Sequence, residues 1–487
     1  MSERMEGERQ GVTSIESRPM DRPDLVEWDV QSPDTLKNSH LGLTTIASVP
    51  PEVLACILDF VYHRSDSDKN KRPNSPVVFS HVCKFWRSVA LDNPLYWARI
   101  IVTPLWKLDE VETFLDRSKE RPLDLRIFVN INLTTTDRLT RPPLLDNYEN
   151  LRNLISPHIH RCRIFRLQGY FDEPTQFLVP YLLESLRSID MPFLEQFIVD
   201  GRLEFEHEIS ARELFSSAPF LRDLRIGGHE LTSYLLPLSN ITKLHITPAP
   251  SERFSPKQLN IIFNACRCLT ELALYSDILN LDGIHLSPLF IFPSLLTLQL
   301  LAYMTTVAEF LSLISSAPKL RRLVLVPVTR HDLESLNQST FPSLASIVLS
   351  PIRENSWVAI DHASTCFPDI TQLILANVYP DEFSRYFLER TTPLFPCLLE
   401  LALKNVDEAL GRVINDFVIF RHFKKVPLQT IFVDEPSMRH LLLHSQSWED
   451  TKVVGVDLIG PLGEDLTQLV TCSAYFAPLI RGGNLTR

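Results

Sequence analysis

One apolar pattern recurs through the second and third quarters of this chain and continues beyond them. It consists of an apolar residue, two variable residues, an apolar residue, one variable residue and a third apolar residue. Units begin at Leu194, Leu221, Ile241, Leu269, Leu295, Leu320, Leu344, Ile370 and Leu398, with outlying units at Cys162 and Leu428. Most steps between units are about 24 to 28 residues. The alternation within a unit predicts a short strand with one buried face, so the chain is expected to fold as stacked units.

Helical patterns separate the predicted strands, as in Val307, Phe310, Leu311 and Ile314. Strand and helix repeated at this period are typical of leucine-rich repeats. The Asn or Cys that usually follows the third apolar position is mostly replaced here, by His229, Ala249, Asp277 and Val328 in four units. We therefore expect an α/β fold in which residues 161–460 form an irregular leucine-rich-repeat solenoid with a parallel concave sheet. The alternative is an irregular α/β stack without a smooth curve.

Prolines mark the start of many units. A proline lies two positions before the first apolar residue in seven of them: Pro192, Pro219, Pro293, Pro318, Pro342, Pro368 and Pro396. The residue before a proline avoids the helical conformation, so the preceding helix is expected to end there. Outside the array, Pro122 to Val129 alternates as an entry strand and follows a helical pattern from Val111 to Ser118.

Residues 46–102 form a different kind of unit. Ser48 is a candidate cap for a helix that starts at Pro50 or Pro51, where a missing N–H costs nothing, and its apolar residues are Val53, Leu54, Ile57, Leu58 and Val61. A second helix is predicted from Pro76, with Val78, Val82, Phe85, Trp86 and Val89 on its apolar face. A last short helix capped by Asp92 or Asn93 carries Leu95, Trp97 and Ile100. The sequence thus predicts two amphipathic helices followed by a short third helix.

This segment resembles an F-box domain, particularly the variant common in mushroom-type (basidiomycete) fungi. The resemblance lies in Val49-Pro50-Pro51-Glu52-Val53-Leu54, Val82-Cys83-Lys84-Phe85-Trp86-Arg87 and Pro94-Leu95-Tyr96-Trp97. It covers about 55 residues. Val49 replaces the usual Leu, and the charged stretch from Arg64 to Ser75 is longer than the loop of the family.

The resemblance implies that this unit binds the Skp-type adaptor of a cullin–RING ubiquitin ligase. The implied adaptor contacts are Pro50, Glu52, Val53, Leu54, Ile57 and Val82, and the implied F-box core residues are Trp86 and Trp97. On periodicity alone, all of these residues fit the core of a three-helix cap equally well. Because a unit of about 50 residues buries little surface, part of its apolar face is expected to have a partner, either the adaptor or the repeats that follow.

The remaining segments complete the expected organisation. Residues 1–40 are polar and charged, so a disordered tail is expected there. Residues 103–160 are expected to form a linking helix and an entry strand, and residues 461–487 a C-terminal segment. The net charge of −11 argues against nucleic-acid binding. The sequence contains no apolar run of about 18 residues, so no membrane span is predicted. Eight cysteines in 487 residues do not make a disulfide framework, which favours a cytoplasmic or nuclear location.

Signs of chemistry are sparse. The sequence contains no glycine-rich phosphate loop and no Gly-x-Ser-x-Gly or His-Glu-x-x-His motif. His158-x-His160-x-Cys162 could place metal ligands along a strand, but no second ligand pair follows at a zinc spacing. We therefore expect no catalytic residue, metal or cofactor. The expected function is substrate recognition for an SCF-type ubiquitin ligase, with an unknown target protein held by the repeats. The alternatives are an interaction scaffold that joins no ligase and an enzyme with residues spread over the repeats.

Overall fold

The computed structural model describes residues 49–64, 75–103, 107–130, 144–170, 182–200, 212–227, 231, 234–247, 254–275, 279, 287–301, 306–326, 328–349, 357, 359–376, 378–442, 448 and 451–456. The predicted tail at 1–40, most of the charged stretch between residues 64 and 75, and the segment 461–487 lie outside these residues. The described residues from Pro51 onward belong to one compact unit.

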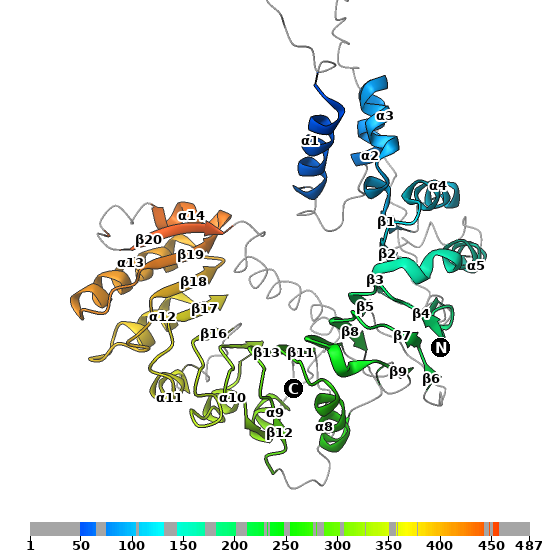
Figure 1. Cartoon of the computed structure of the whole chain (residues 1–487). Helices are drawn as coiled ribbons and strands as arrows, with labels where there is room; N and C mark the ends of the chain where they lie inside the picture. Colours follow the sequence, from blue (N-terminus) through cyan, green and yellow to red (C-terminus); the bar gives the residue numbers. More distant parts are fainter. Residues whose placement is uncertain are drawn as a thin grey trace, which may run out of the picture. The chain divides into compact units, whose positions relative to one another are not determined.

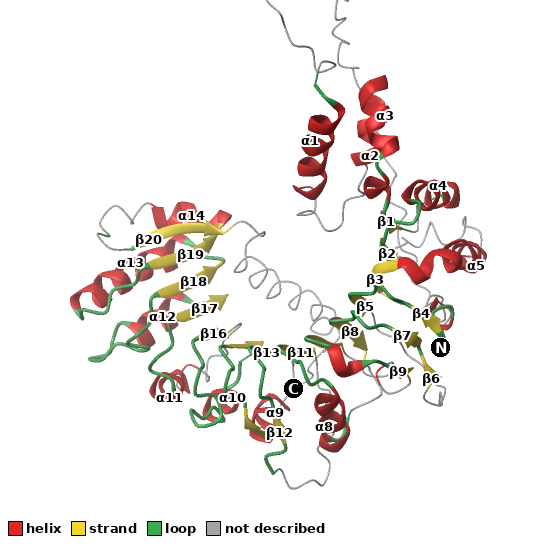
Figure 2. Cartoon of the chain, in the orientation of Figure 1, coloured by secondary structure: helices red, strands yellow, loops and turns green. Residues whose placement is uncertain are grey.

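The described chain has a mixed α/β fold built on one parallel sheet of fourteen strands (Figures 1 and 2). Its strands, in spatial order, are β1 Arg99–Val102, β2 Leu123–Asn130, β3 Cys162–Tyr170, β5 Gln196–Asp200, β8 Asp223–Gly227, β10 Lys243–Thr247, β11 Glu271–Tyr275, β13 Thr297–Leu301, β15 Arg322–Val326, β16 Ser346–Leu349, β17 Gln372–Ala376, β18 Glu400–Lys404, β19 Thr430–Asp434 and β20 Lys452–Val456. Strand order follows chain order, as stacking of successive repeats requires. The predicted parallel sheet is therefore confirmed.

Helices precede the sheet and connect many of its strands. They are α1 Pro51–Arg64, α2 Ser75–Val82, α3 Lys84–Asp92, α4 Leu108–Ser118, α5 Leu144–Ile155, α8 Pro256–Ala265, α9 Thr306–Leu313, α10 Arg330–Glu334, α11 Ile360–Cys366, α12 Pro380–Phe387, α13 Glu408–Phe423 and α14 Glu435–Leu442, with 3-10 turns η4 Pro94–Trp97, η6 Ser156–Arg161 and η7 Leu238–Asn240. Short strand pairs, β4 Ile189–Asp190 with β7 Phe215–Ser217, β6 Arg212–Glu213 with β9 Tyr234–Leu235, and β12 Phe290–Ile291 with β14 Ile314–Ser316, join some of the connections. From α8 to α13 the helices lie on one side of the sheet (Figure 1), which we call the helix side.

The recurring leucines form the core on the helix side. Register places Leu298, Leu323, Ile347, Leu373 and Leu401 next to one another, and all five are fully buried. Successive residues of a strand point to opposite faces, so the residues between the leucines lie on the second face of the sheet. The apolar pattern of the sequence therefore fixed which residues of each strand face the helices.

The unit prolines occupy tight turns that lead into the strands. In the unit at Leu320, the backbone N–H of Leu320 donates to the carbonyl of Ala317 at 3.1 Å, which places Pro318 second in the turn. The same bond joins Leu221 to Ala218 and Leu344 to Phe341, both at 3.2 Å. Proline suits this position because its fixed φ matches the turn. The prolines thus shape the turn itself, in addition to excluding a helix before it.

Two expectations about local structure are corrected. The single helix predicted from Pro76 to Val89 is two helices, because Cys83 is extended and its Sγ accepts the backbone N–H of Trp86 at 3.5 Å as the cap of α3. The His158 and His160 pair lies on η6 and not on a strand. Cys162, the first residue of β3, is buried, and burial raises the pKa of its thiol to about 12.

Candidate functional site

Tyr96 is the centre of the helical unit formed by α1, α2, α3 and η4. Its ring is fully buried, packs 5.6 Å from Tyr62 of α1 and 6.1 Å from Phe79 of α2, and its hydroxyl donates to the carbonyl of Ala55 at 3.0 Å. Burial, and then the nearby Asp59, raise the pKa of Tyr96 well above its usual range. The last short helix was predicted to carry Leu95, Trp97 and Ile100, but η4 ends at Trp97 and Ile100 lies in β1. In the structure Leu95 is exposed, because residues two apart in a helix do not share a face.

The two tryptophans predicted as core residues differ in burial. Trp97 is 1% exposed, donates its indole N–H to the carbonyl of Ala90 at 2.8 Å and meets Phe114 of α4 edge-on at 5.0 Å. Trp86 is only half-buried and packs 6.3 Å from Phe79. Trp97 therefore joins the helical unit to α4, whereas Trp86 packs within the unit.

Helix α1 is apolar on two adjacent faces. Leu54, Leu58 and Tyr62, at four-residue spacing, are buried. A second row stays exposed although every member is apolar: Val53 is 47% exposed, Ile57 47%, Phe60 65% and Val61 45%. Helix α2 repeats this arrangement with Val78 and Val82, which are 55% and 53% exposed. We call these six residues the apolar face of the helical unit.

The residues predicted as adaptor contacts are divided between this face and the interior. Val53, Ile57 and Val82 belong to the apolar face, and Pro50 and Glu52 are exposed at the start of α1. Leu54 is 1% exposed and lies inside the unit, so its side chain is part of the packing of α1. Sequence reasoning did not single out Phe60, although its spacing from Ile57 and Val53 places it on the same helix face.

The second face of the sheet changes character along its length. From β2 to β13 most of its side chains are charged or polar, and Arg126 binds Asp124 through two hydrogen bonds of 3.0 and 2.8 Å. The position between the second and third apolar residues of each strand points to this face, and Arg225 and His245 are half-buried there. Ala273, Gln299 and Val324 at the same position of later strands are buried. Among the neighbouring residues, Glu195, Arg222, Lys243 and Arg321 are exposed and Glu271 is half-buried.

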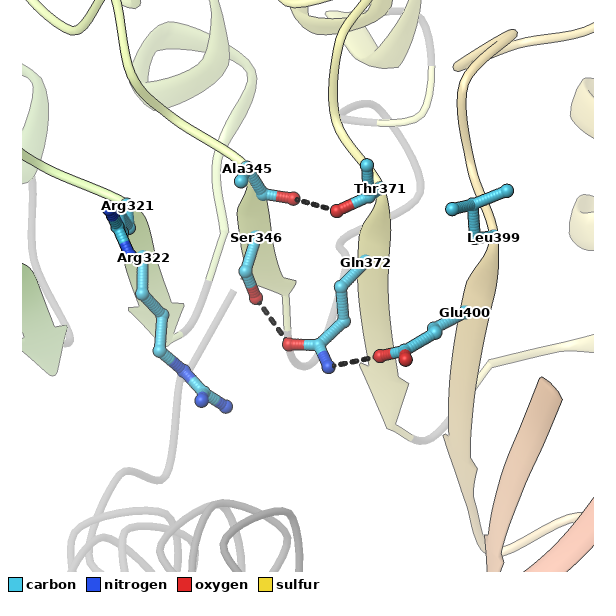
Figure 3. A pocket seen from close by; sticks show the side chains of 8 residues that line it. All are labelled: Arg321, Arg322, Ala345, Ser346, Thr371, Gln372, Leu399 and Glu400. Carbon is cyan, nitrogen blue, oxygen red and sulfur yellow. Dashed lines mark hydrogen bonds between the residues drawn. The ribbon is translucent and has the colours of Figure 1, made fainter. Parts of the chain in front are cut away.

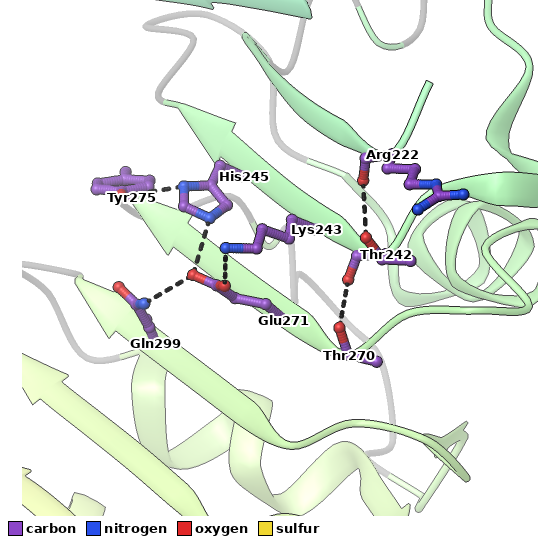
Figure 4. Close-up of polar contacts among 8 residues, drawn as sticks. All are labelled: Arg222, Thr242, Lys243, His245, Thr270, Glu271, Tyr275 and Gln299. Atoms are coloured by element: carbon purple, nitrogen blue, oxygen red, sulfur yellow. Dashed lines mark hydrogen bonds and ion pairs between the residues drawn. The ribbon is translucent and has the colours of Figure 1, made fainter. Parts of the chain in front are cut away.

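Glu271 is the centre of a polar cluster on β10, β11 and β13 (Figure 4). Its carboxylate lies 3.3 Å from His245 Nε2 and 3.2 Å from Lys243 Nζ, and it accepts a hydrogen bond of 3.2 Å from Gln299 Nε2. On the far side of His245, Nδ1 lies 3.4 Å from the Tyr275 hydroxyl. Burial opposes ionisation of Glu271, but the hydrogen bond from His245 and the charges of His245 and Lys243 outweigh it and lower its pKa to about 2.

Glu271→Gln is expected to remove about 1 to 3 kcal/mol of stability at neutral pH. The folded-state pKa lies below the ordinary value of 4.5, so the carboxylate stabilises the fold above pH 4.5 and loses this contribution as the pH falls toward 2. Urea unfolding of both proteins between pH 2 and 7 measures the difference. The two stabilities should converge at the acid end, and a constant gap across that range would contradict the prediction. Glu195→Gln, at an exposed site beside β5, is the control and should change stability little.

A second polar row continues along the first residues of the later strands (Figure 3). Ser346 Oγ donates to Gln372 Oε1 at 2.7 Å, and Gln372 Nε2 donates to a Glu400 carboxylate oxygen at 2.8 Å. Arg322 and these residues line a shallow hollow of about 360 Å³. A similar hollow of about 400 Å³ lies between Gln196, Asp223 and Lys243. Both are open and lined by donors and acceptors, which suits contact with side chains of another protein more than enclosure of a small molecule.

The described residues offer little for metal chemistry. Within them no three His, Cys, Asp or Glu side chains gather as metal ligands. His158 Nδ1 lies 3.2 Å from an Arg161 guanidinium nitrogen, and burial, and then this cation, lower the pKa of His158. Cys266 ends α8 and is buried, while Cys268 is exposed. Among the helices described, none is long and apolar enough to cross a membrane.

Comparison with known proteins adds no family to these observations. No family model matches the chain, and no curated protein matches it.

Proposed function

We propose that this chain is the substrate-recognition subunit of a cullin–RING (SCF-type) ubiquitin ligase. In this proposal the helical unit binds the Skp-type adaptor, and the second face of the sheet binds a target protein. Transfer of ubiquitin takes place on partner subunits in the cytoplasm or nucleus, so this chain contributes binding and no catalytic residue. The observation that carries the proposal is the apolar face of α1 and α2.

Exposed valine and isoleucine side chains on one side of a helix indicate a partner. A helix that is covered on one side by its own unit usually has polar residues on its other side. Helix α1 instead presents Val53, Ile57 and Val61 on its exposed side, and Val78 and Val82 of α2 are exposed as well. Exposed apolar surface of this kind marks sites of protein association. Its position on the segment that resembles an F-box supports the adaptor as that partner.

The buried and exposed apolar rows have separate roles under this proposal. Leu54, Leu58 and Tyr62 hold α1 against Tyr96 and its neighbours, while Val53, Ile57 and Val82 supply contact area for the adaptor. Glu52 and Pro50, both exposed at the start of α1, lie at the border of the apolar face. The polar second face, with mixed charges around Glu271 and Gln372, supplies the specific contacts to a target.

Co-purification with the Skp-type adaptor tests the proposal. The full chain is expected to bind, and Val53→Asp with Ile57→Asp is expected to weaken binding at least tenfold, because the two carboxylates would be buried at the interface without partners. Both positions are exposed in the free chain, so the variant should remain folded by circular dichroism. Lys84→Asp adds a carboxylate at an exposed position of α3 and serves as the matched control. Absence of binding by the well-folded full chain would reject the ligase function and leave an interaction scaffold.

A further inference from the structure

Two phenylalanines are exposed in neighbouring turns that lead into the sheet. Phe193 is 47% exposed and precedes β5, and Phe220 is 53% exposed and precedes β8. In the first turn, as in the second, the residue after the phenylalanine closes the turn, and the backbone N–H of Leu194 donates to the carbonyl of Met191 at 3.2 Å. Because β5 and β8 pair directly, the two turns lie side by side. We call this stretch, where β5, β8 and β10 begin, the amino edge.

The turn itself does not require phenylalanine. The same position holds small, polar or charged residues in later units, namely Asn240, Cys268, Ser294, Lys319, Ser343, Asp369 and Cys397. Within the described residues, neither Phe193 nor Phe220 packs its ring against another aromatic ring. Single exposed apolar side chains are common, but two in adjacent turns beside a hollow are typical of a surface that another protein covers.

The hollow of about 400 Å³ at the start of β5, β8 and β10 is lined by Phe220. Its backbone is held firmly. The Glu195 carbonyl accepts two N–H groups from the next unit, at 3.0 and 3.1 Å, and the Arg222 carbonyl accepts two more, both at 2.9 Å. A hollow with a fixed backbone is preformed, so binding there costs little ordering.

Arg222 supplies an available positive charge at this hollow. It is exposed, and its side chain points away from the cluster around Glu271 (Figure 4). Its guanidinium makes no hydrogen bond or ion pair with the part of the chain that the structure describes. Lys243, which also lines the hollow, is instead held 3.2 Å from Glu271. A guanidinium at an exposed edge can bind a carboxylate of another chain through two parallel hydrogen bonds.

The neighbouring charges limit where that carboxylate can lie. Glu195 occupies the position of Arg222 in the preceding unit and is exposed, and Asp223 lines the hollow and is half-buried. A carboxylate placed over β5 or deep in the hollow would meet these like charges and be repelled. The favourable place is therefore beside Arg222, next to the exposed ring of Phe220.

We propose that the amino edge binds a segment of the target protein in which an apolar side chain adjoins a carboxylate. The apolar side chain packs against Phe193 and Phe220, and the carboxylate binds Arg222. Aromatic side chains and arginine are the residues that contribute most to protein interfaces. The proposal rests on the proposed role of the repeats in holding a target, and it names the chemistry that they select.

Selection from a phage-displayed library of random peptides tests the proposal with the full chain. Enriched peptides are expected to contain Phe, Leu or Trp adjacent to Asp or Glu. Phe193→Ser with Phe220→Ser should weaken binding of an enriched peptide at least tenfold, measured by fluorescence anisotropy. Both side chains are exposed, so the variant should keep the circular dichroism of the parent chain. Lys319→Ser, at the same turn position of a later unit, is the matched control and should bind as the parent does.

A charge swap tests the role of Arg222 separately. Arg222→Glu should weaken binding of the enriched peptide at least tenfold. Lysine in place of the peptide carboxylate should restore binding to this variant and weaken binding to the parent chain. Arg321→Glu, at the equivalent exposed position of the unit at Leu320, should leave binding unchanged.

Three results would overturn the proposal. They are a selection that enriches no peptide or only basic ones, equal binding by the parent chain and the double phenylalanine variant, and failure of the lysine peptide to bind Arg222→Glu. None of these measurements uses the adaptor. A chain that binds such peptides but not the adaptor would therefore support the recognition surface and reject the ligase function.

Discussion

Arg421→Met is expected to lower the free energy of unfolding of the C-terminal repeats by about 2 to 4 kcal/mol. Arg421 of α13 is fully buried, and its guanidinium donates to the backbone carbonyls of Leu394 and Leu398 at 3.0 Å and of Phe395 at 3.3 Å. Methionine keeps the length of the side chain but supplies no donor, so these buried carbonyls would lose their partners. Loss of several buried hydrogen bonds outweighs the gain from removing a desolvated cation.

The carbonyls that Arg421 binds belong to the turn that leads into β18. Phe395 in this turn has a φ of 47°, in the left-handed region that a phenylalanine rarely adopts. The turn therefore carries a conformational cost, and the guanidinium holds it in place. Burial lowers the pKa of Arg421 to about 10, so the side chain remains charged at neutral pH.

Hydrogen exchange and urea unfolding measure this effect. The amides of β17 and β18 should exchange faster in Arg421→Met, and the urea midpoint of the C-terminal repeats should fall. Arg412→Met on the same helix removes an exposed guanidinium and should leave both readouts near those of the parent chain. A difference below about 0.5 kcal/mol between the Arg421 and Arg412 variants would show that the turn is held by other contacts.

Repeats made the sheet predictable. An apolar residue, most often leucine or isoleucine, at the same three places in each unit marks residues that face the helices, whatever the variable residues are. The entry strand near Leu123 also follows from alternation alone. Periodicity did not reveal which residues of the second face are buried, because the repeating apolar positions lie on the helix side.

Single polar residues with structural roles were less predictable. Arginine is usually exposed, and the partners of Arg421 lie about 25 residues earlier in the chain, so no local pattern marks it. Arg161 has a similar role in the N-terminal part, where it binds the carbonyls of Leu115, Lys119 and Arg121 at the end of α4. The break at Cys83 was missed because neither glycine nor proline marks it, and a cysteine cap is uncommon.

For the candidate adaptor surface, the sequence predicted which residues of α1 are apolar but not which of them face outward. Periodicity identified Val53, Leu54 and Ile57 as apolar positions of one helix, but α1 is apolar over two adjacent faces. Which face is internal depends on where Tyr96 and Phe79 pack, and these residues come from two other elements. A helix with two apolar faces therefore needs tertiary contacts before its free face can be assigned.

Trp97→Ala is expected to destabilise the junction between the helical unit and α4 by about 3 to 5 kcal/mol. The indole is 1% exposed, donates to Ala90 at 2.8 Å, and contacts Phe114 and the guanidinium of Arg117. Its removal leaves a large cavity, a buried carbonyl without its donor and an unpaired aromatic edge. Few side chains could compensate, because the surrounding residues are themselves fixed by the sheet and by α3.

Limited proteolysis and hydrogen exchange over residues 84–118 measure the effect of Trp97→Ala. Protection should fall in α3, η4 and α4 and persist in β15 to β18, because stacked repeats depend mainly on their nearest neighbours. Leu95→Ala on the same turn, where the side chain is exposed, should change little. Equal loss of protection in all strands would show that the helical unit and the whole sheet unfold together. Local loss would instead show that the proposed adaptor-binding unit has a stability of its own.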